Sequence, residues 1–394
     1  MTLELQLGPR GPSFFRKISD WWGVRPFTQI ALLLGVIVIF YVFSANTMAS
    51  LQHKGINPGF EFLGRAANFE IGETPIPFKA GDTYARAILV GLINTIKVAV
   101  LGCILAAILG LALGVARLSG NLLLASVVRW YVEIVRNTPL LLQLFFWSAI
   151  THAFPPPKQA ISAFNVFYLS NRGVFTPGLF VENFSLWTWV FIVLIGLAFT
   201  ASLLWLARRG RLKFASFGLV LGAGLLALVM VMVLTGATAR FEVPVLGGFN
   251  IRGGFSLTPE FAALLIGLVV KFSAAISEIV RAGIESVADG QWEAARALGL
   301  HNGQIMRLIV LPQALRVIVP LTTSIFLDLT KDSSLAVAIG YPDLVNVLNT
   351  TANVTGQSLE TLAVMIAIYL TLNLTVSAAM NWYNRSVVLR GSAR

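Results

Sequence analysis

The long apolar runs of this sequence leave few folds open to it. About eight stretches of roughly 20 mostly apolar residues, the length that crosses the hydrocarbon of a bilayer, lie along the chain. Only helices and closed barrels satisfy every backbone polar group inside lipid, and runs this long indicate helices. The sequence therefore predicts an all-α integral membrane protein with about eight transmembrane helices. The runs cover approximately 27–47, 88–116, 137–154, 185–207, 214–236, 259–280, 314–331 and 360–383.

The composition excludes soluble and disordered classes of protein. Of 394 residues, 56% are hydrophobic and only 12% are charged, whereas a soluble domain carries roughly 25% charged residues. The single cysteine, Cys103, rules out an internal disulfide. The three histidines, His53, His152 and His301, are too far apart for a zinc-binding HExxH motif. We therefore expect neither a metal site nor catalytic residues.

The distribution of positive charge predicts membrane topology rather than nucleic-acid binding. The net charge is +11, but the basic residues lie in short segments between apolar runs and not on one polar domain. If the N-terminus is cytoplasmic, cytoplasmic segments hold about twice as many Lys and Arg residues as external ones. Both termini are therefore predicted to be cytoplasmic. The first run could instead be a signal peptide, although Trp21 and Trp22 suit an anchor at the membrane interface.

Small residues recur every four positions along the second run, at Gly102, Ala106, Gly110 and Gly114. Such a stripe lets two helix backbones approach closely in a membrane. Packing within the chain is the favoured interpretation, with a subunit interface as the alternative.

The segment between the sixth and seventh runs breaks the apolar pattern. Asp289 and Gly290 can begin a helix, Gly299 can end it, and Asn302 can cap a second one. We expect two short helices bent at Gly299, the first over 291–298. Its small apolar stripe, Ala294, Ala297 and Leu298, needs a partner to dock into, because a short isolated helix is marginally stable.

These residues carry a resemblance to a known family. Glu293-Ala294-Ala295, then Gly299, then Leu311-Pro312 resembles the EAA motif of the permease subunits of binding-protein-dependent ATP-binding-cassette (ABC) importers. A second stretch is similar to the polar amino-acid branch of that family, at Glu133, Arg136, Asn137, Thr138 and Pro139. The chain's length and layout resemble the larger permease subunit of general L-amino-acid importers.

The resemblance implies a type I importer core over 86–384, interrupted by an insert at 155–257 that carries two spans. Residues 1–85 form a cytoplasmic N-terminus, an extra span and a periplasmic loop, and 385–394 form a cytoplasmic tail. The resemblance further implies a channel-forming subunit in a bacterial inner membrane. Its partners are a second permease, two ATPase subunits and a periplasmic amino-acid-binding protein, besides membrane lipid.

The chain itself is expected to bind no cofactor. It contains no G-x-x-x-x-G-K-[ST] loop that would cradle phosphates, so ATP and Mg²⁺ are expected on the partner ATPase. The resemblance assigns ATPase coupling to the cytoplasmic segment. The residues concerned are Gly290, Glu293, Ala294, Ala295, Gly299, Leu311 and Pro312.

Two other functions compete with this interpretation. An ion-coupled secondary carrier predicts internal repeats, and no clear duplication is visible. A membrane-embedded enzyme needs a catalytic dyad or a metal triad, and none stands out.

Four charged residues in or beside the apolar runs are candidates for the substrate pathway. Lys271 lies near the middle of the sixth run, where a charge is costly. It could pair with Glu278, two turns further on, or offer its charge to the α-carboxylate of a passing amino acid. Lys331, beside Asp332, ends the seventh run and can reach Asp328 at i, i+3.

Overall fold

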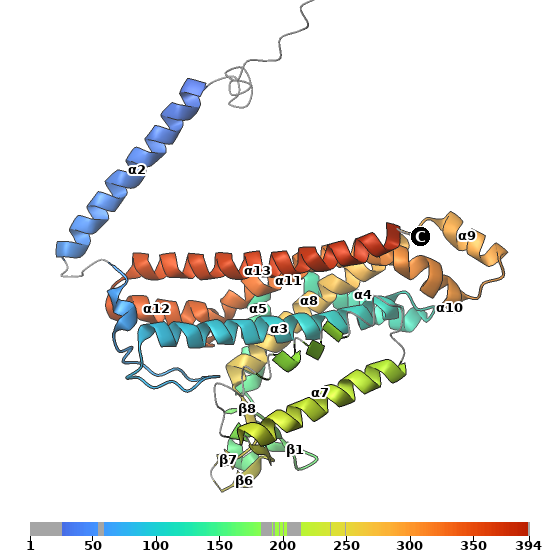
Figure 1. The fold of residues 1–394 in the computed structure, drawn as a ribbon, viewed down its shortest axis with the longest axis horizontal. Helices are drawn as coiled ribbons and strands as arrows, with labels where there is room; N and C mark the ends of the chain where they lie inside the picture. Colours follow the sequence, from blue (N-terminus) through green and yellow to red (C-terminus); the bar gives the residue numbers. More distant parts are fainter. Residues whose placement is uncertain are drawn as a thin grey trace, which may run out of the picture.

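The structure is a computed structural model that describes residues 26–53, 59–182, 191, 194–196, 198–199, 201–202, 214–236, 238–248 and 250–392. Its helices run mainly side by side along one direction (Figure 1). The long helices are α2 (Pro26–His53), α3 (Tyr84–Arg117), α4 (Leu122–Asn137), α5 (Leu140–His152), α7 (Phe214–Thr235), α8 (Pro259–Glu285), α11 (Leu311–Asp332), α12 (Leu344–Thr355) and α13 (Ser358–Ser392). Shorter helical segments are η1 (Glu61–Gly64), η2 (Pro157–Gln159), α9 (Asp289–Ala297), α10 (Asn302–Ile305), η3 (Met306–Val310) and η4 (Ser333–Ile339).

The predicted runs coincide with these helices wherever the structure describes them. By length and apolar composition, five described helical segments can cross a membrane, and α5 is a shorter apolar helix. The run 214–236 corresponds to α7, and the run 185–207 lies largely outside the described residues. The chain is thus a multi-pass helical membrane protein.

Side-chain caps explain where several of these helices begin. The Thr83 hydroxyl accepts the amide of Arg86 at the start of α3, and Thr258 accepts the amide of Phe261 at the start of α8. Asn121 accepts the amides of Leu123 and Leu124. Each cap satisfies a backbone donor that has no partner within its own helix.

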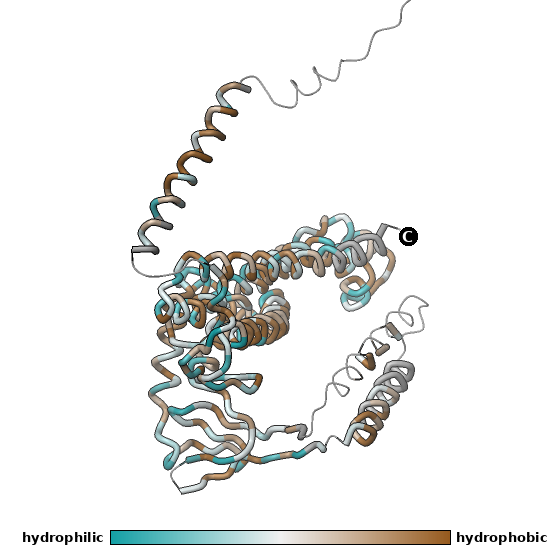
Figure 2. Tube along the Cα trace, turned by 60° about the vertical axis from the view of Figure 1, so that its left-hand side comes forward, coloured by the Kyte–Doolittle hydropathy of each residue, from teal (hydrophilic) through white to brown (hydrophobic). Residues whose placement is uncertain are grey.

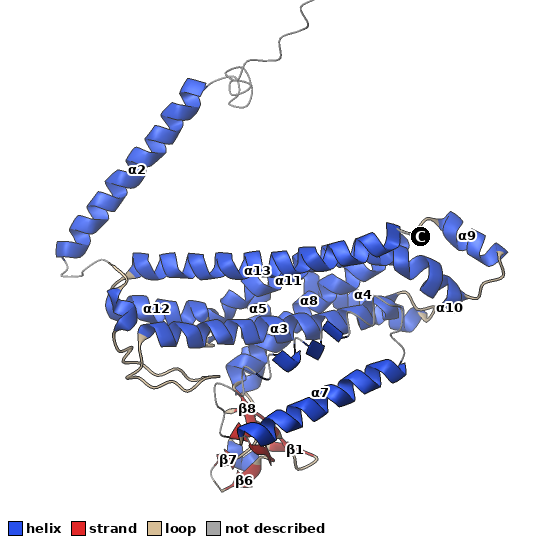
Figure 3. Cartoon of the chain, viewed as in Figure 1, coloured by secondary structure: helices blue, strands red, loops and turns tan. Residues whose placement is uncertain are grey.

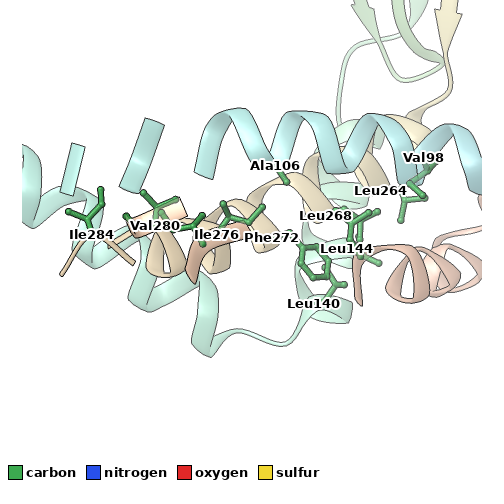
Figure 4. Packing of buried hydrophobic residues seen from close by; sticks show 14 of the residues in the cluster. Val98, Ala106, Leu140, Leu144, Leu264, Leu268, Phe272, Ile276, Val280 and Ile284 are labelled. Carbon is green, nitrogen blue, oxygen red and sulfur yellow. The ribbon is translucent and has the colours of Figure 1, made fainter. Parts of the chain in front are cut away.

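Helices α3 and α8 form the centre of the bundle, and Gly110 and Gly114 of the predicted stripe make their contact, whereas Gly102 faces Leu329 of α11. A Cβ atom added at Gly110 would lie 2.6 Å from Ile276 Cβ, and one at Gly114 would lie 2.7 Å from Val280 Cβ. The expectation of packing within the chain is therefore confirmed. Figure 4 shows Val98 and Ala106 of α3 beside the row of α8 residues from Leu264 to Ile284, with Leu140 and Leu144 of α5 adjoining them.

The predicted insert contains strands, so the expectation of an all-helical chain holds for the bundle but not for the insert. A four-stranded antiparallel sheet has the order β1-β2-β3-β8, and two further pairs are β4-β5 and β6-β7. Figures 2 and 3 show these strands together beyond one end of α7, linking it to the main bundle. The strands are β1 (Ile161–Ala163), β2 (Phe167–Ser170), β3 (Gly173–Thr176), β4 (Gly178–Glu182), β5 (Thr238–Glu242), β6 (Val245–Gly247), β7 (Asn250–Arg252) and β8 (Phe255–Leu257).

Helix α12 carries a buried carboxyl at its start. Asp343 is 1% exposed, and its Oδ1 accepts the amide of Asn346 at 2.9 Å, which caps the helix. Its Oδ2 has no hydrogen-bond partner. Burial raises the pKa of Asp343 to about 7, because the charged form loses its hydration.

Candidate functional site

The segment α9–α10 projects from one end of the bundle, at the same end as the chain's C-terminus (Figure 1). Helix α9 begins at Asp289 and ends at Ala297, within two residues of the prediction. Gly299 follows with a φ of +74°, a left-handed conformation that only glycine adopts without cost. The predicted bend at Gly299 is confirmed.

The two faces of α9 have different surroundings. Ala295 is buried and joins the main core together with the half-buried Trp292. Glu293 and Ala294 are exposed, and Leu298 directly after the helix is 77% exposed. The stripe predicted to need a partner is therefore free of contacts with its own chain's core.

The second short helix begins one residue earlier than expected. Its N-cap is His301 rather than Asn302, and the His301 amide donates a hydrogen bond to Gln304 Oε1 at 3.2 Å. After α10 the chain continues as one turn of π-helix into α11. Leu311 and Pro312 begin α11 directly after this π-helical turn.

Glu278 is the centre of an ion-pair cluster that joins three helices. It accepts hydrogen bonds from Arg117 at the end of α3 and from Arg281, one turn along α8. Arg136 of α4 lies 3.9 Å away. Arg281 also pairs with Glu285, the last residue of α8. The cluster thus lies a few residues before the α9–α10 segment.

Lys271 does not pair with Glu278, which was one of its two predicted roles. Its Nζ donates to three backbone carbonyls at the end of α4: Arg136 and Thr138 at 3.0 Å, and Val135 at 3.4 Å. The motif of Glu133, Arg136, Asn137, Thr138 and Pro139 therefore forms the end of α4 and the break before α5. The sequence places Lys271 and this motif in separate runs, and the fold brings them together.

Lys331 and Asp332 lie at the end of α11. Lys331 Nζ is 3.8 Å from Asp328, which confirms the predicted i, i+3 contact, and both side chains are 57% exposed. A pair this exposed contributes little to stability.

A second half-buried ion pair lies at the opposite end of α8, and it was not predicted from the sequence. Lys97 pairs with Glu73, whose other carboxylate oxygen accepts the Thr258 hydroxyl at 2.7 Å. The Lys97 ammonium also lies 4.3 Å from the centre of the Phe261 ring. A cavity of about 390 Å³ adjoins Glu73. Glu73 lies in a loop, where the sequence has no helical or strand periodicity that would indicate its contact with Lys97. Among the described residues, no group of three or more His, Cys, Asp or Glu side chains could hold a metal ion.

The fold defines a multi-pass helical membrane protein from which the exposed α9–α10 segment projects at one end. Residues 214–389 match the family model described as the inner membrane component of binding-protein-dependent transport systems. The Escherichia coli (strain K12) protein YhdX, named as an amino-acid ABC transporter permease, is 43% identical over 92% of this chain and 93% of its own. The chain therefore belongs to the family of binding-protein-dependent transport system inner membrane components.

Other relatives match over a similar length. The general L-amino acid transport system permease protein AapQ of Rhizobium johnstonii is 39% identical over 92% of each chain. The glutamate/glutamine/aspartate/asparagine transport system permease protein BztB of Rhodobacter capsulatus is 37% identical over 92% of this chain and 93% of its own. Among solved structures, an amino acid ABC transporter crystallised with histidines matches 77% of this chain and 95% of its own, with 22% identity and a TM-score of 0.46.

Proposed function

We propose that this chain is the channel-forming permease subunit of an ATP-driven importer that carries a broad range of L-amino acids across the bacterial inner membrane. The exposed, bent α9–α10 segment carries this proposal, together with the relatives that are named as amino-acid permeases. The chain is a transport component, and ATP and Mg²⁺ belong to a separate ATPase. The full assembly adds a second permease, two ATPase subunits and a periplasmic amino-acid-binding protein.

The α9–α10 segment is the docking site for the ATPase. Its free face offers Ala294 and Leu298 for burial, and Glu293 for pairing with a basic residue of the partner. Because α9 follows α8 after three residues, a displacement of α9 acts directly on the end of α8. In this arrangement the segment is cytoplasmic, and so is the C-terminus beside it (Figure 1).

The substrate pathway runs along the helices that carry the four candidate charges. Lys271 and Glu278 lie on α8, and Lys331 and Asp332 lie at the end of α11. Helices α8 and α11 pack against each other, since a Cβ atom added at Gly283 would lie 2.3 Å from Ile318.

Co-purification of the ATPase with this chain tests the proposal, with Leu298→Gln as the variant. Burial of a leucine is worth about 1.5–3 kcal/mol, so ATPase retention should fall about tenfold or more. Leu122→Gln is the matched control, because Leu122 is 83% exposed at the start of α4, outside the docking segment. Equal retention by both variants would contradict the docking assignment, and absence of amino-acid uptake by the complete wild-type assembly would contradict the transport function.

A further inference from the structure

The break between α4 and α5 leaves backbone carbonyls without their usual partners. Pro139 has no N–H, so it cannot donate to the carbonyl of Val135 four residues earlier, as an uninterrupted helix would require. Helix α4 ends at Asn137, and α5 begins only at Leu140. Carbonyls freed inside a membrane protein need donors from elsewhere in the protein, because lipid offers none.

Two side chains supply these donors. Lys271 of α8 donates to the carbonyls of Val135, Arg136 and Thr138. Gln143, one turn into α5, donates through Nε2 to Val135 at 2.9 Å and to Thr138 at 3.1 Å. The three N–H groups of the lysine ammonium thus match three carbonyls, and charge-assisted hydrogen bonds of this kind are among the stronger ones.

The contact joins two parts of the bundle that the chain does not connect directly. Lys271 lies near the middle of α8, and the same helix holds the Glu278 cluster and leads into α9. The break lies in the α4–α5 segment, which packs along α8 through Leu144 and Tyr131: the Tyr131 hydroxyl donates to the Val270 carbonyl at 3.2 Å. A movement of α8 therefore acts on the break through Lys271.

We infer that Lys271 is a positioning residue for transport: it holds the α4–α5 break to α8 through three backbone carbonyls and does not bind the substrate itself. This inference rests on the proposed transport function. It replaces both roles predicted from the sequence, pairing with Glu278 and binding of the substrate's α-carboxylate.

Kinetics of uptake in proteoliposomes containing the complete importer separate a positioning role from substrate binding. Lys271→Met should lower kcat about tenfold and leave the KM for amino acids within about twofold, because the substrate contacts remain. Lys271→Arg should restore most of the uptake, since a guanidinium can donate to the same carbonyls. Arg129→Met removes an exposed cation of α4 away from the break and should leave uptake unchanged. A rise in KM of about tenfold with unchanged kcat would overturn the inference.

A double-mutant cycle with Pro139→Ala tests the carbonyl contacts directly. Thr138 is extended in the break, with a ψ of 128°. Alanine at 139 returns an N–H and lets this residue become helical, which brings the N–H to the Val135 carbonyl, so Pro139→Ala should suppress the Lys271→Met defect by about threefold or more. Equal activity of the double variant and Lys271→Met would overturn the inference.

The thermal stability of the assembled complex gives a second reading of the same cycle that needs no substrate. Where Lys271→Met alone does not assemble, recovery of assembly in the Lys271→Met, Pro139→Ala double variant supports the inference. If the double variant also fails to assemble while Gln143→Met assembles normally, the inference is overturned. Absence of uptake by the wild-type complex would count against the transport function and leave this stability cycle to decide the inference.

Discussion

Replacement of Gly110 by alanine should separate α3 from α8. The added Cβ would lie 2.6 Å from Ile276 Cβ, 2.7 Å from its Cγ2 and 2.9 Å from the Ser273 carbonyl oxygen. Two of these atoms are fixed to or part of the α8 backbone, so no rotation of a side chain relieves the contact. The helices themselves have to move apart.

The magnitude follows from two opposing terms. Alanine is favoured over glycine inside a helix by about 1 kcal/mol, whereas overpacking of a tightly packed interior costs about 1–3 kcal/mol. The net effect of Gly110→Ala should be a loss of up to about 2 kcal/mol. Gly102→Ala should be close to neutral, because its Cβ meets only the end of the Leu329 side chain, at 3.2 Å. Gly222→Ala in α7 meets nothing within 4 Å and should be neutral or stabilising.

Thermal unfolding of the detergent-purified protein, followed by size-exclusion chromatography after heating, measures this order. Gly110→Ala should unfold at the lowest temperature, Gly102→Ala near the wild type and Gly222→Ala at or above it. If Gly110→Ala were as stable as Gly222→Ala, close packing of α3 on α8 would not contribute to stability, and the reasoning from the glycine stripe would be refuted.

Three further predictions concern other parts of the chain. Gly299→Val imposes a left-handed backbone on a β-branched residue at a cost of about 1–2 kcal/mol or more. ATP hydrolysis should become uncoupled from amino-acid uptake when both are measured in the same vesicles, and intact coupling would contradict the role of the bend. Because the pKa of Asp343 is raised from 3.8 to about 7, the folded state favours the protonated carboxyl. The free energy of unfolding should therefore fall by about 1.4 kcal/mol per pH unit as the pH rises from about 4 to about 7, and then level off. Asp343→Asn keeps the helix cap and should remove this dependence in thermal unfolding between pH 5 and 8; a persistent slope would assign it to another group. Lys331→Met should lower uptake at unchanged membrane abundance, whereas wild-type uptake would leave Lys331 only its exposed pair with Asp328.

The helices of the bundle could be predicted from the sequence because membrane spans are defined by local apolar composition. The run 259–280, for example, lies wholly within α8. Helix α12 did not appear among the predicted runs, because its twelve residues are too few to cross a bilayer and include several polar side chains. The strands of the insert are three to five residues long, which is too short for an alternation of apolar and polar residues to be recognised in the sequence.

The docking segment was predicted more completely than the charged residues inside the bundle. Glycine at 299 adopts the left-handed conformation at little cost, and helices commonly end where such a residue stands. The partners of Lys271 depend on how α8 lies against α4, which is a tertiary property. A lysine near the middle of a span suggests a carboxylate partner, and the sequence offered Glu278. The acceptors of Lys271 are backbone carbonyls, which every residue carries, so the side chains near the break do not identify them. Pro139 does indicate a free carbonyl four residues earlier, and this could have been used to predict the contact.

The strands of the insert leave the bundle after α5 and return to it at the beginning of α8. These two helix ends are neighbours, since His152 at the end of α5 lies 3.4 Å from Glu260 at the beginning of α8. The returning strand β8 is followed at once by Thr258, the cap of α8. The path of the chain through the bundle would be the same if a short turn joined the two ends. The chain can therefore accommodate additional domains at this position without rearranging its membrane core. The entropy of closing such a loop grows only with the logarithm of its length, so a long addition costs little more than a short one. This junction is a natural attachment point for new parts, whether acquired during evolution or introduced as a reporter.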